Sequence, residues 1–297
     1  LFRIARYLRQ TCNSDDIVHA HLFPSMWFVS LAARLTRWSG TIVCTEHSTH
    51  NGRRGTWVGR LIDSSLYPRY DRIACISDGT KDALGEWMPR VSDRLVVIEN
   101  GAELPHETFI ARPPVTKPVI VSAGRLHRLK NYPAALEAIA LLEDLDFEYW
   151  IAGQGTEATA LKLLARRLGV ADRVRFLGFV EDMPRLLAAA DVFLMPSLWE
   201  GFGLSAVEAM NSGLPAIVSD VDGLREVVGH DGACGILVPP NDPSAIALAL
   251  RRLLTNSEER RSLGRNGFVR SKQFSVEAMV QRYIEFYGLS DTVTHSP

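Results

Sequence analysis

The chain has 297 residues, of which 46% are hydrophobic and 23% charged, and its formal net charge at pH 7 is −1. This size and composition exclude a disordered chain and are typical of a globular protein with two compact domains. A total charge near zero gives no general attraction to nucleic acid. No uninterrupted apolar run approaches the roughly 18 residues that a membrane-spanning helix needs.

The charge is unevenly distributed, because the first 60 residues are basic. They contain eight arginines against three acidic residues, with three tryptophans among them. Such a segment is typical of a face that meets a membrane surface or an anionic substrate. A solvated face above buried tryptophans explains it equally well, so both interpretations stay open.

The four cysteines are far apart in the sequence and lack the spacing of zinc ligands or of a redox motif. We expect buried thiols in a reducing compartment, and therefore a cytoplasmic protein. The chain begins on Leu1 inside an arginine-bearing helical pattern, which leaves an upstream signal peptide open.

Strand-like apolar runs alternate with helical patterns in the first hundred residues, as in a parallel sheet covered by helices. The expected strands are DIVHAH, TIVCTEH, RIACIS and LVVIENG, with helices at 25–38 and 79–87 between them. Residues 108–118 hold three prolines and no hydrophobic period, so they predict a linker.

A second series of six strands follows, each with a helical segment after it. The strands are PVIVSAGRL, FEYWIAGQG, VRFLGF, DVFLMPS, PAIVSD and GILVPP. Asp242 and Pro243 mark the start of a helix, as N-cap and first helical residue. Residues 275–289 predict an amphipathic helix with Val276, Met279, Tyr283 and Phe286 on one side.

The fold class expected from this pattern is α/β, with two Rossmann-like domains. We place the first at residues 1–110, the second at 111–272, and a final helix with a polar tail at 273–297. Four strands in the first domain against six in the second predict that the first is incomplete and that its leading βα units are missing.

Ligands of open α/β sheets bind at the carboxyl ends of the strands. Arg125 and Lys130 follow the strand PVIVSAG, and Gly124 between them and the strand allows a close backbone approach. Two cations at this position suit a diphosphate. Ordinary surface cations remain the alternative.

The stretch SLWEGFGLSAVEAM, residues 197–210, predicts a loop that enters a helix after the strand DVFLMPS. The free amides of Gly203, Leu204 and Ser205 would form an anion site. Glu200 and Glu208 flank it and would accept hydrogen bonds from sugar hydroxyls. The alternative, in which Glu200 caps the amides and Glu208 is solvated, explains Glu208 poorly because its helical neighbours are apolar.

GRLHRLKN followed by EGFGLSAVEAM, an E-x7-E pattern, resembles the retaining glycosyltransferases of the GT-B group, family 4-like, also called glycosyl transferases group 1. The segments that match in family order are DIVHAH, TEHST, CISDGTKDAL, VIENGAE, IAGQG, VRFLGFVEDM and PAIVSDVDGLREVV. The resemblance covers essentially the whole chain. It implies a cleft between the two domains and a final helix that returns to the first.

The resemblance also implies roles for the donor-side residues. Arg125 and Lys130 would bind the donor diphosphate and neutralise the leaving group, Glu208 would hold the ribose, and Glu200 would contact the transferred sugar. The remaining implied donor contacts are Gly124, the loop and helix start at Gly201, Phe202, Gly203 and Leu204, and Phe179 and Val180 near the base.

On the acceptor side, His21 matches the family histidine that faces the reacting sugar, and we group it with Glu46 and His47 at the neighbouring strand end. The implied catalytic set is Glu200, His21, Arg125 and Lys130. A structural role for His21 stays equally open.

The reaction implied is transfer of a hexose or N-acetylhexosamine from a UDP- or GDP-sugar to an acceptor hydroxyl with retained configuration. It needs neither metal nor cofactor, because the nucleotide-sugar is a substrate. The acceptor would be a saccharide or lipid-linked molecule of polysaccharide, lipopolysaccharide or glycolipid synthesis, with no nucleic acid partner. Peripheral contact with the inner face of the plasma membrane is left open.

Three alternative functions each fit part of the sequence. GQGTEA, residues 153–158, fits the dinucleotide fingerprint of a nicotinamide-dependent oxidoreductase, but the next strand ends without the required acid. A glycoside hydrolase using Glu200 and Glu208 has no use for a diphosphate site. A non-catalytic binding protein would not need the complete charged set.

Two further features complete the expectations. The DVD string at residues 220–222 is interpreted as a non-metal loop. The family's opening strand and glycine-rich loop have no match, which predicts a truncated chain and leaves its own activity open.

Overall fold

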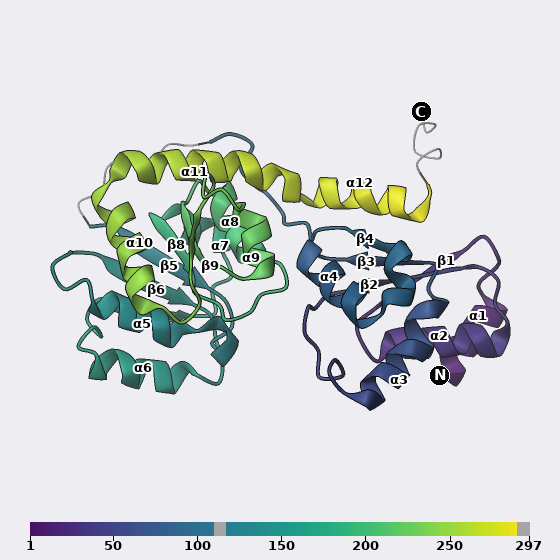
Figure 1. The fold of residues 1–297 in the computed structure, drawn as a ribbon. Coiled ribbons are helices and arrows are strands. Elements are labelled where there is room, and N and C mark those ends of the chain that lie inside the picture. Colours follow the sequence, from purple (N-terminus) through teal and green to yellow (C-terminus); the bar gives the residue numbers. More distant parts are fainter. Residues whose placement is uncertain (110–116, 290–297) are drawn as a thin grey trace. The chain divides into compact units, whose positions relative to one another are not determined.

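The computed structural model describes residues 1–109 and 117–289 and confirms the α/β class. It divides into two compact units (Figure 1): the first comprises Leu1–Asn100 and Glu277–Pro297, and the second comprises Gly101–Val276. Most of the predicted linker and the polar tail fall at 110–116 and 290–297, outside the described residues.

The first unit contains a parallel sheet in the order β1-β2-β3-β4. Its strands are β1 (Ile17–His21), β2 (Thr41–Glu46), β3 (Arg72–Cys75) and β4 (Leu95–Val97). Its helices are α1 (Phe2–Gln10), α2 (Ser25–Thr36), α3 (Trp57–Leu66), α4 (Asp78–Trp87) and α12 (Val276–Tyr287), with the 3-10 turns η1 (Tyr67–Arg69) and η2 (Pro89–Arg94). All four predicted strands are present, and α3 is an addition that the pattern did not indicate.

The apolar side of α12 covers part of the first sheet. Phe286 is buried against Val43 of β2 and Ala74 of β3, and Met279 and Tyr283 pack at the edge of the same cluster. These are three of the four residues that the sequence placed on one side of this helix. Burial of large aromatic side chains is worth about 1.5–3 kcal/mol each, which is enough to hold a single helix on a sheet.

The second unit contains a six-stranded parallel sheet in the order β10-β9-β8-β5-β6-β7. Its strands are β5 (Val119–Ala123), β6 (Glu148–Ala152), β7 (Val174–Gly178), β8 (Val192–Met195), β9 (Ala216–Ser219) and β10 (Ile236–Val238). Its helices are α5 (Tyr132–Ala140), α6 (Ala158–Arg167), α7 (Met183–Ala188), α8 (Leu204–Asn211), α9 (Asp222–Val228), α10 (Pro243–Thr255) and α11 (Ser257–Ser271), with the 3-10 turns η3 (Arg128–Lys130) and η4 (Lys272–Phe274).

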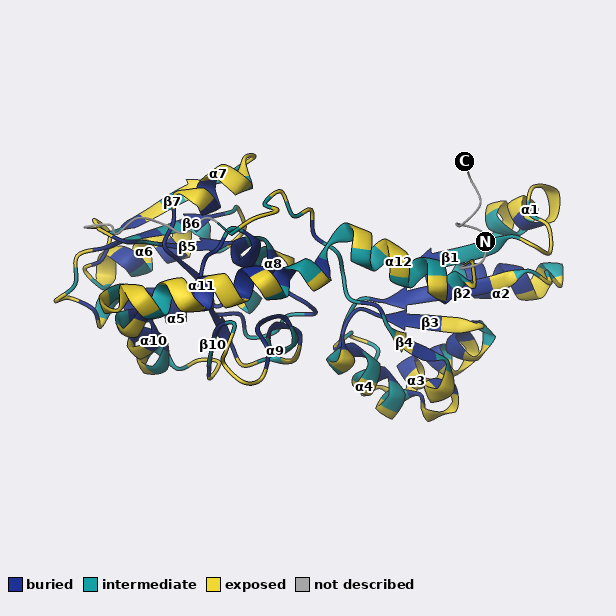
Figure 2. Cartoon of the chain, turned by 90° about the horizontal axis from the view of Figure 1, so that it is seen from above, coloured by how far each residue is buried: buried dark blue, intermediate teal, exposed yellow. Residues whose placement is uncertain are grey.

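This strand order reverses direction between β5 and β8, as in a doubly wound dinucleotide-type sheet. The crevice outside the carboxyl ends of the two strands at such a reversal is where these folds bind ligands. The strands lie in the buried centre of the unit, while the helices alternate buried and exposed faces (Figure 2). The capping prediction at α10 is confirmed, because the Asp242 side chain accepts a hydrogen bond from the Ala245 amide at 2.9 Å.

The division between the units differs from the boundary expected at residue 110. Ala102 forms a parallel bridge with Ser275, and its amide donates to the carbonyl oxygen of Phe274 at 2.9 Å. His106 donates to the Asn211 side chain of α8 at 3.2 Å. Residues 101–109 therefore belong to the second unit, and its last residue is Val276 instead of the expected 272.

Candidate functional site

Lys130 and Glu200 meet at the reversal point of the second sheet. Lys130 ends the turn η3 after β5, Glu200 lies in the loop after β8, and the Lys130 ammonium donates to Oε2 of Glu200. Their side chains are 24% and 19% exposed, so the pair is shielded but reachable. A backbone hydrogen bond from Leu198 to Leu129, 2.8 Å long, ties the two loops together beside the pair.

Arg125 provides a second cation at the same strand end. It follows β5, is exposed, and forms no side-chain ion pair among the described residues. An exposed guanidinium and a shielded ammonium that follow the same strand are groups that can receive a ligand with several negative charges. The structure thus brings Arg125, Lys130 and Glu200 to one strand-end region, as the sequence predicted from separate motifs.

The start of α8 leaves its first amides without a side-chain cap. Gly203 occupies the N-cap position with φ +105°, and no side chain caps the helix. A Cβ atom at Gly203 would lie 2.5 Å from Cδ2 of Leu224, so only glycine fits this position. Uncapped amides at the positive end of the helix dipole favour an anion. The alternative in which Glu200 caps them is wrong, since Glu200 pairs with Lys130.

Phe202, in the same loop, is part of the core. Its ring is buried and packs edge-on against Phe274 at 5.3 Å between centroids. Gly201 lies against the backbone of Gly223, because a Cβ atom built on Gly223 would come within 2.6 Å of the carbonyl carbon of Gly201. These contacts hold the loop rigidly, so Gly201 and Phe202 offer a ligand their backbone.

Glu208 lies one turn into α8 and is only partly buried. No side chain in the described part of the protein forms a hydrogen bond or ion pair with its carboxylate. Burial raises the pKa of Glu208 above its usual value. A half-buried carboxylate without a partner is costly, and the cost is removed if a ligand supplies hydroxyl donors.

Tyr132 is a site residue that the sequence did not single out. Its hydroxyl donates to the carbonyl oxygen of Gly124 at 3.1 Å, and burial together with the negative charge of Glu200 raises its pKa. It therefore positions the backbone from which Arg125 extends. Its place directly after the motif GRLHRLKN was the available signal.

The loop GQGTEA packs against residues 124–130, the cation-bearing loop that holds Arg125 and Lys130. Cβ atoms built on Gly153 and Gly155 would lie 1.9 Å from the Gly124 oxygen and 2.2 Å from the Leu126 oxygen. The amide of Leu126 donates to the Gln154 oxygen at 2.9 Å. These glycines are required for packing between two loops, which removes the main reason for a nicotinamide site.

Two other predicted positions have simpler surroundings. Phe179 and Val180 directly follow β7, the edge strand two places from β5, and Phe179 is largely exposed.

Asp220 and Asp222 of the DVD string both pair with Arg225, at 2.6 and 3.3 Å. Their carboxylates are thus engaged with a guanidinium.

In the first unit, the structure brings His21 and His47 together. Nδ1 of His21 and Nε2 of His47 are 3.1 Å apart at the carboxyl ends of β1 and β2, and burial lowers the pKa of both. Glu46 does not join them. It is buried, accepts a hydrogen bond from the Tyr67 hydroxyl, and lies 3.6 Å from Nη2 of Arg54. Successive residues of a strand point to opposite faces, which explains why Glu46 and His47 separate.

His19 completes a cluster of three histidines that the sequence analysis missed. Its ring lies 4.0 Å from the His21 ring, and its two nitrogens contact the hydroxyls of Tyr287 and Thr45 at 2.6 and 2.7 Å. Burial, with the nearby His21 and His47, lowers the pKa of His19 to about 4. The available signal was the spacing in DIVHAH, since residues two apart on a strand share a face.

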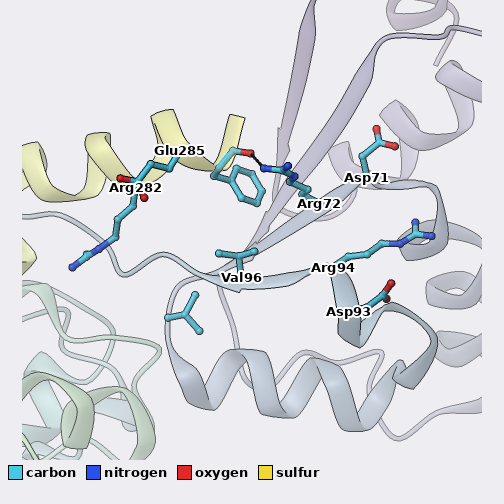
Figure 3. Close-up of a pocket in the computed structure, with 9 residues that line it drawn as sticks. Asp71, Arg72, Asp93, Arg94, Val96, Arg282 and Glu285 are labelled. Carbon is cyan, nitrogen blue, oxygen red and sulfur yellow. Dashed lines mark hydrogen bonds between the residues drawn. The ribbon is translucent and has the colours of Figure 1, made fainter. Parts of the chain in front are cut away.

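A pocket of about 700 Å³ lies elsewhere in the first unit (Figure 3). Its lining residues are Asp71, Arg72, Asp93, Arg94, Val96, Val97, Arg282, Glu285 and Phe286. Arg72 donates to the carbonyl oxygen of Phe286 at 2.7 Å, and Arg282 pairs with Glu99 at 2.9 Å. These arginines hold α12 on the sheet. Because Arg72 begins β3, the pocket lies at the opposite sheet end from the histidines, and we assign it no ligand.

Two units, each built on a parallel sheet covered by helices, are the architecture of the GT-B class of fold. Solved structures agree. The chain superimposes on Anabaena HepE, described in complex with UDP, with a TM-score of 0.84 and 22% identity over 97% of this chain and 82% of that one. A glycosyltransferase from Rickettsia africae gives a TM-score of 0.84 at 20% identity, over 99% and 81% of the two chains.

The chain belongs to the family described as glycosyl transferases group 1, which it matches over residues 106–270, while residues 1–105 match glycosyltransferase family 4. It is 31% identical to a glycogen synthase of Mycobacterium tuberculosis, over 80% of this chain and 60% of that protein. It is 30% identical to a D-inositol 3-phosphate glycosyltransferase of Salinispora tropica, over 92% and 64%. The chain thus spans about 60% of the length of these relatives.

A lipopolysaccharide core biosynthesis glycosyltransferase of Rhizobium meliloti is 33% identical, over 78% of this chain and 68% of that protein. Within the residues that the structure describes, no helix is long and apolar enough to cross a membrane. The four cysteines are free thiols, and of these Cys44 and Cys75 are buried as expected, whereas Cys12 and Cys234 are only partly so.

Proposed function

We propose that the chain binds a nucleoside diphosphate sugar in its second unit and acts as a retaining glycosyltransferase, or as the donor-binding part of one. The observation that carries this proposal is the Lys130–Glu200 pair at the reversal point of the sheet, beside Arg125 and the uncapped start of α8. Two cations and a helix N-terminus suit a diphosphate, and a carboxylate in contact with one of those cations suits the sugar attached to it.

The ion pair between Lys130 and Glu200 would change partners when a donor binds. Without a donor, Glu200 neutralises Lys130. An incoming diphosphate competes for the Lys130 ammonium, and the Glu200 carboxylate becomes available to accept hydrogen bonds from sugar hydroxyls. As the glycosidic bond breaks, Lys130, Arg125 and the α8 amides stabilise the negative charge on the departing diphosphate. The proposal requires no cofactor and no metal ion, because these groups supply the positive charge.

Glu208 is assigned to the donor ribose. Its carboxylate is half-buried and lacks a protein partner among the described residues, so two ribose hydroxyls would satisfy it. Phe179 and Val180 are assigned to the base. The donor would be a UDP- or GDP-sugar carrying a hexose or N-acetylhexosamine; the solved structure of Anabaena HepE with UDP and glucose favours UDP as the first to test.

His21, with His47, is assigned to the acceptor side. Burial lowers the pKa of both rings, which favours the neutral imidazole that can donate and accept hydrogen bonds with hydroxyl groups. In the proposed reaction the departing phosphate takes the acceptor proton on the same face, and neither glutamate acts as a nucleophile. The acceptor would be a saccharide or a lipid-linked molecule of surface polysaccharide, lipopolysaccharide or glycolipid synthesis, at the cytoplasmic face of the membrane.

Calorimetric titration of the chain with UDP, GDP, UDP-glucose and NAD tests the proposal. We expect binding of a nucleoside diphosphate and tighter binding of its sugar conjugate. In Glu200→Gln the affinity for UDP should be kept or raised, because the carboxylate no longer competes for Lys130, and the additional affinity that the sugar provides should be lost. Binding of NAD without any nucleoside diphosphate would overturn the proposal.

A further inference from the structure

Helix α3 of the first unit exposes three of its five apolar side chains and buries its only acid. Trp57, Val58 and Leu61 are 80%, 45% and 66% exposed, while Asp63 is fully buried. Trp57 and Leu61 are four residues apart and therefore lie on one face of the helix. A helix on a solvated protein surface has the reverse arrangement, with its charges outward.

The buried acid is fully engaged inside the unit. Asp63 accepts hydrogen bonds from Nε of Arg53 at 3.0 Å and from Nε1 of Trp87 at 2.9 Å. The negative charge of Asp63 is thereby compensated inside the unit, by Arg53. The outward residues of α3 are Trp57, Val58, Arg60, Leu61, Ser64 and Ser65. This face carries a positive charge and no negative one.

A pocket of about 320 Å³ adjoins this face. It is lined by Arg60, Ser64, Trp87, Met88, Pro89 and Arg90, and no acidic side chain lines it. The Arg60 guanidinium lies over the Trp87 ring, 5.3 Å from its centroid. Neither Arg60 nor Arg90 forms an ion pair within residues 1–109 and 117–289. Two unpaired guanidinium groups and a hydroxyl form a suitable receptor for a phosphate.

We propose that α3 and this pocket form a docking surface for a membrane that contains anionic phospholipids. Trp57, Val58 and Leu61 enter the boundary between headgroups and acyl chains, and Arg60 and Arg90 bind lipid phosphates. The charge pattern favours a lipid surface over a protein, because the apolar and cationic residues share one face that has no acid. In Figure 1, α3 lies at an outer margin of its unit.

The surface continues toward the end of β1. The Arg53 guanidinium, which pairs with Asp63 of α3, also lies 4.1 Å from the centroid of the Phe23 ring. Phe23 and Leu22 are exposed and directly follow His21. This inference extends the proposed function, since a lipid-linked acceptor would be presented from the same surface, but its test is independent of donor binding.

Co-sedimentation with vesicles tests the surface. The chain should bind vesicles that contain phosphatidylglycerol and phosphatidylcholine, with affinity that falls as salt rises, and should bind phosphatidylcholine alone much more weakly. Arg60→Ala with Arg90→Ala should lower the affinity roughly 25-fold, at about fivefold for each arginine. Trp57→Ser with Leu61→Ser should lower it on the order of tenfold or more.

Matched controls come from exposed residues of the second unit, Leu248→Ser on α10 and Arg261→Ala on α11. They should leave vesicle binding unchanged, and circular dichroism with thermal unfolding should report that every variant is folded in both units. Equal binding to both kinds of vesicle, or equal losses in the controls, would overturn the inference. A third result would also overturn it: the parent chain does not bind vesicles but self-associates, and Trp57→Ser with Leu61→Ser abolishes the self-association. That result would assign the face to a second copy of the chain. Vesicle binding without UDP binding would instead refute only the proposed function.

Discussion

Lys130 and Glu200 are 70 positions apart in the chain, yet their side chains form a direct ion pair across the reversal point of the second sheet. Parallel strands β5 and β8 are neighbours, and their carboxyl ends open on the same edge. Removal of either partner leaves the other as a shielded charge without compensation. The two variants should nevertheless differ in ligand binding.

Lys130→Ala should weaken UDP binding roughly 10- to 100-fold, because a charge-assisted hydrogen bond to the diphosphate is lost. The matched control is Arg128→Ala, which removes an exposed cation from the same turn. Calorimetric titration of both variants measures the difference. Equal effects would mean that Lys130 contributes general charge and no specific contact.

Glu208→Gln should weaken UDP binding by roughly tenfold, since an amide accepts hydrogen bonds from ribose less strongly than a carboxylate. Repeating both titrations with 2′-deoxy-UDP completes a double-mutant cycle, in which the effect of the substitution should shrink. If the loss is the same for both nucleotides, Glu208 does not contact the 2′-hydroxyl.

Glu208 also predicts how binding depends on pH. Its pKa is raised in the folded protein, so the carboxylate is protonated at higher pH than a solvated glutamate. At a pH below the pKa of Glu208 in the unfolded chain, the carboxyl group is protonated in both the folded and the unfolded state. At a pH above its raised pKa in the folded protein, the folded state bears the full cost of the buried charge. Glu208→Gln should therefore unfold at higher temperature than the parent at pH 7, and this gain should disappear as the pH falls through the raised pKa. UDP affinity of the parent should fall over that same range.

Gly203→Ala should destabilise the second unit by about 2–4 kcal/mol, from the left-handed backbone and the clash with Leu224 together. Gly169→Ala is a matched control, because Gly169 also has a positive φ of +72° but has open space where the Cβ would be. It should cost only the backbone term, about 1–2 kcal/mol. Urea denaturation compares the two, and equal costs would show that the loop at Gly203 can move away from α9.

The histidine cluster predicts acid sensitivity of the first unit. The pKa of His19 falls from 6.5 to about 4 on folding, so between these values the unfolded chain binds more protons than the folded one. Stability is then lost as the pH falls from 6.5 toward 4. The ionisable groups that face His19 are His21 and His47, with Tyr283 and Tyr287 packed from α12. His19→Gln should reduce the loss between pH 7 and pH 4.5 in thermal unfolding; an unchanged pH profile would assign the loss to other groups.

Much of the fold followed from sequence, because apolar runs that end in glycine or polar residues are a strong local signal. All ten strands among the described residues were expected, and the Asp242 cap was expected at its residue. α3 was missed because three of its five apolar residues face outward and its acid faces inward, which obscures the hydrophobic period that normally indicates a helix against a core. The structural division after Asn100 comes earlier than the expected boundary at residue 110, because Ala102 joins a partner that is distant in sequence.

The candidate site was predictable in its members and less so in its contacts. Arg125, Lys130, Glu200 and Glu208 were identified from their places after strands. Which of them pair depends on strand order, and no local pattern encodes the neighbourhood of β5 and β8. Glu46 was grouped with His47 because adjacent residues look equivalent in a sequence, whereas a strand sends them to opposite faces.

The glycines of GQG have a consequence for how variants of this chain will be interpreted. Gly153 and Gly155 act as a spacer of fixed thickness, because the Gly124 and Leu126 backbones rest directly on them. Any side chain added there must push the cation-bearing loop outward. A Gly155→Ala variant would therefore present as a weakened affinity for diphosphate, although the altered residue would lie behind the binding loop and never meet the donor.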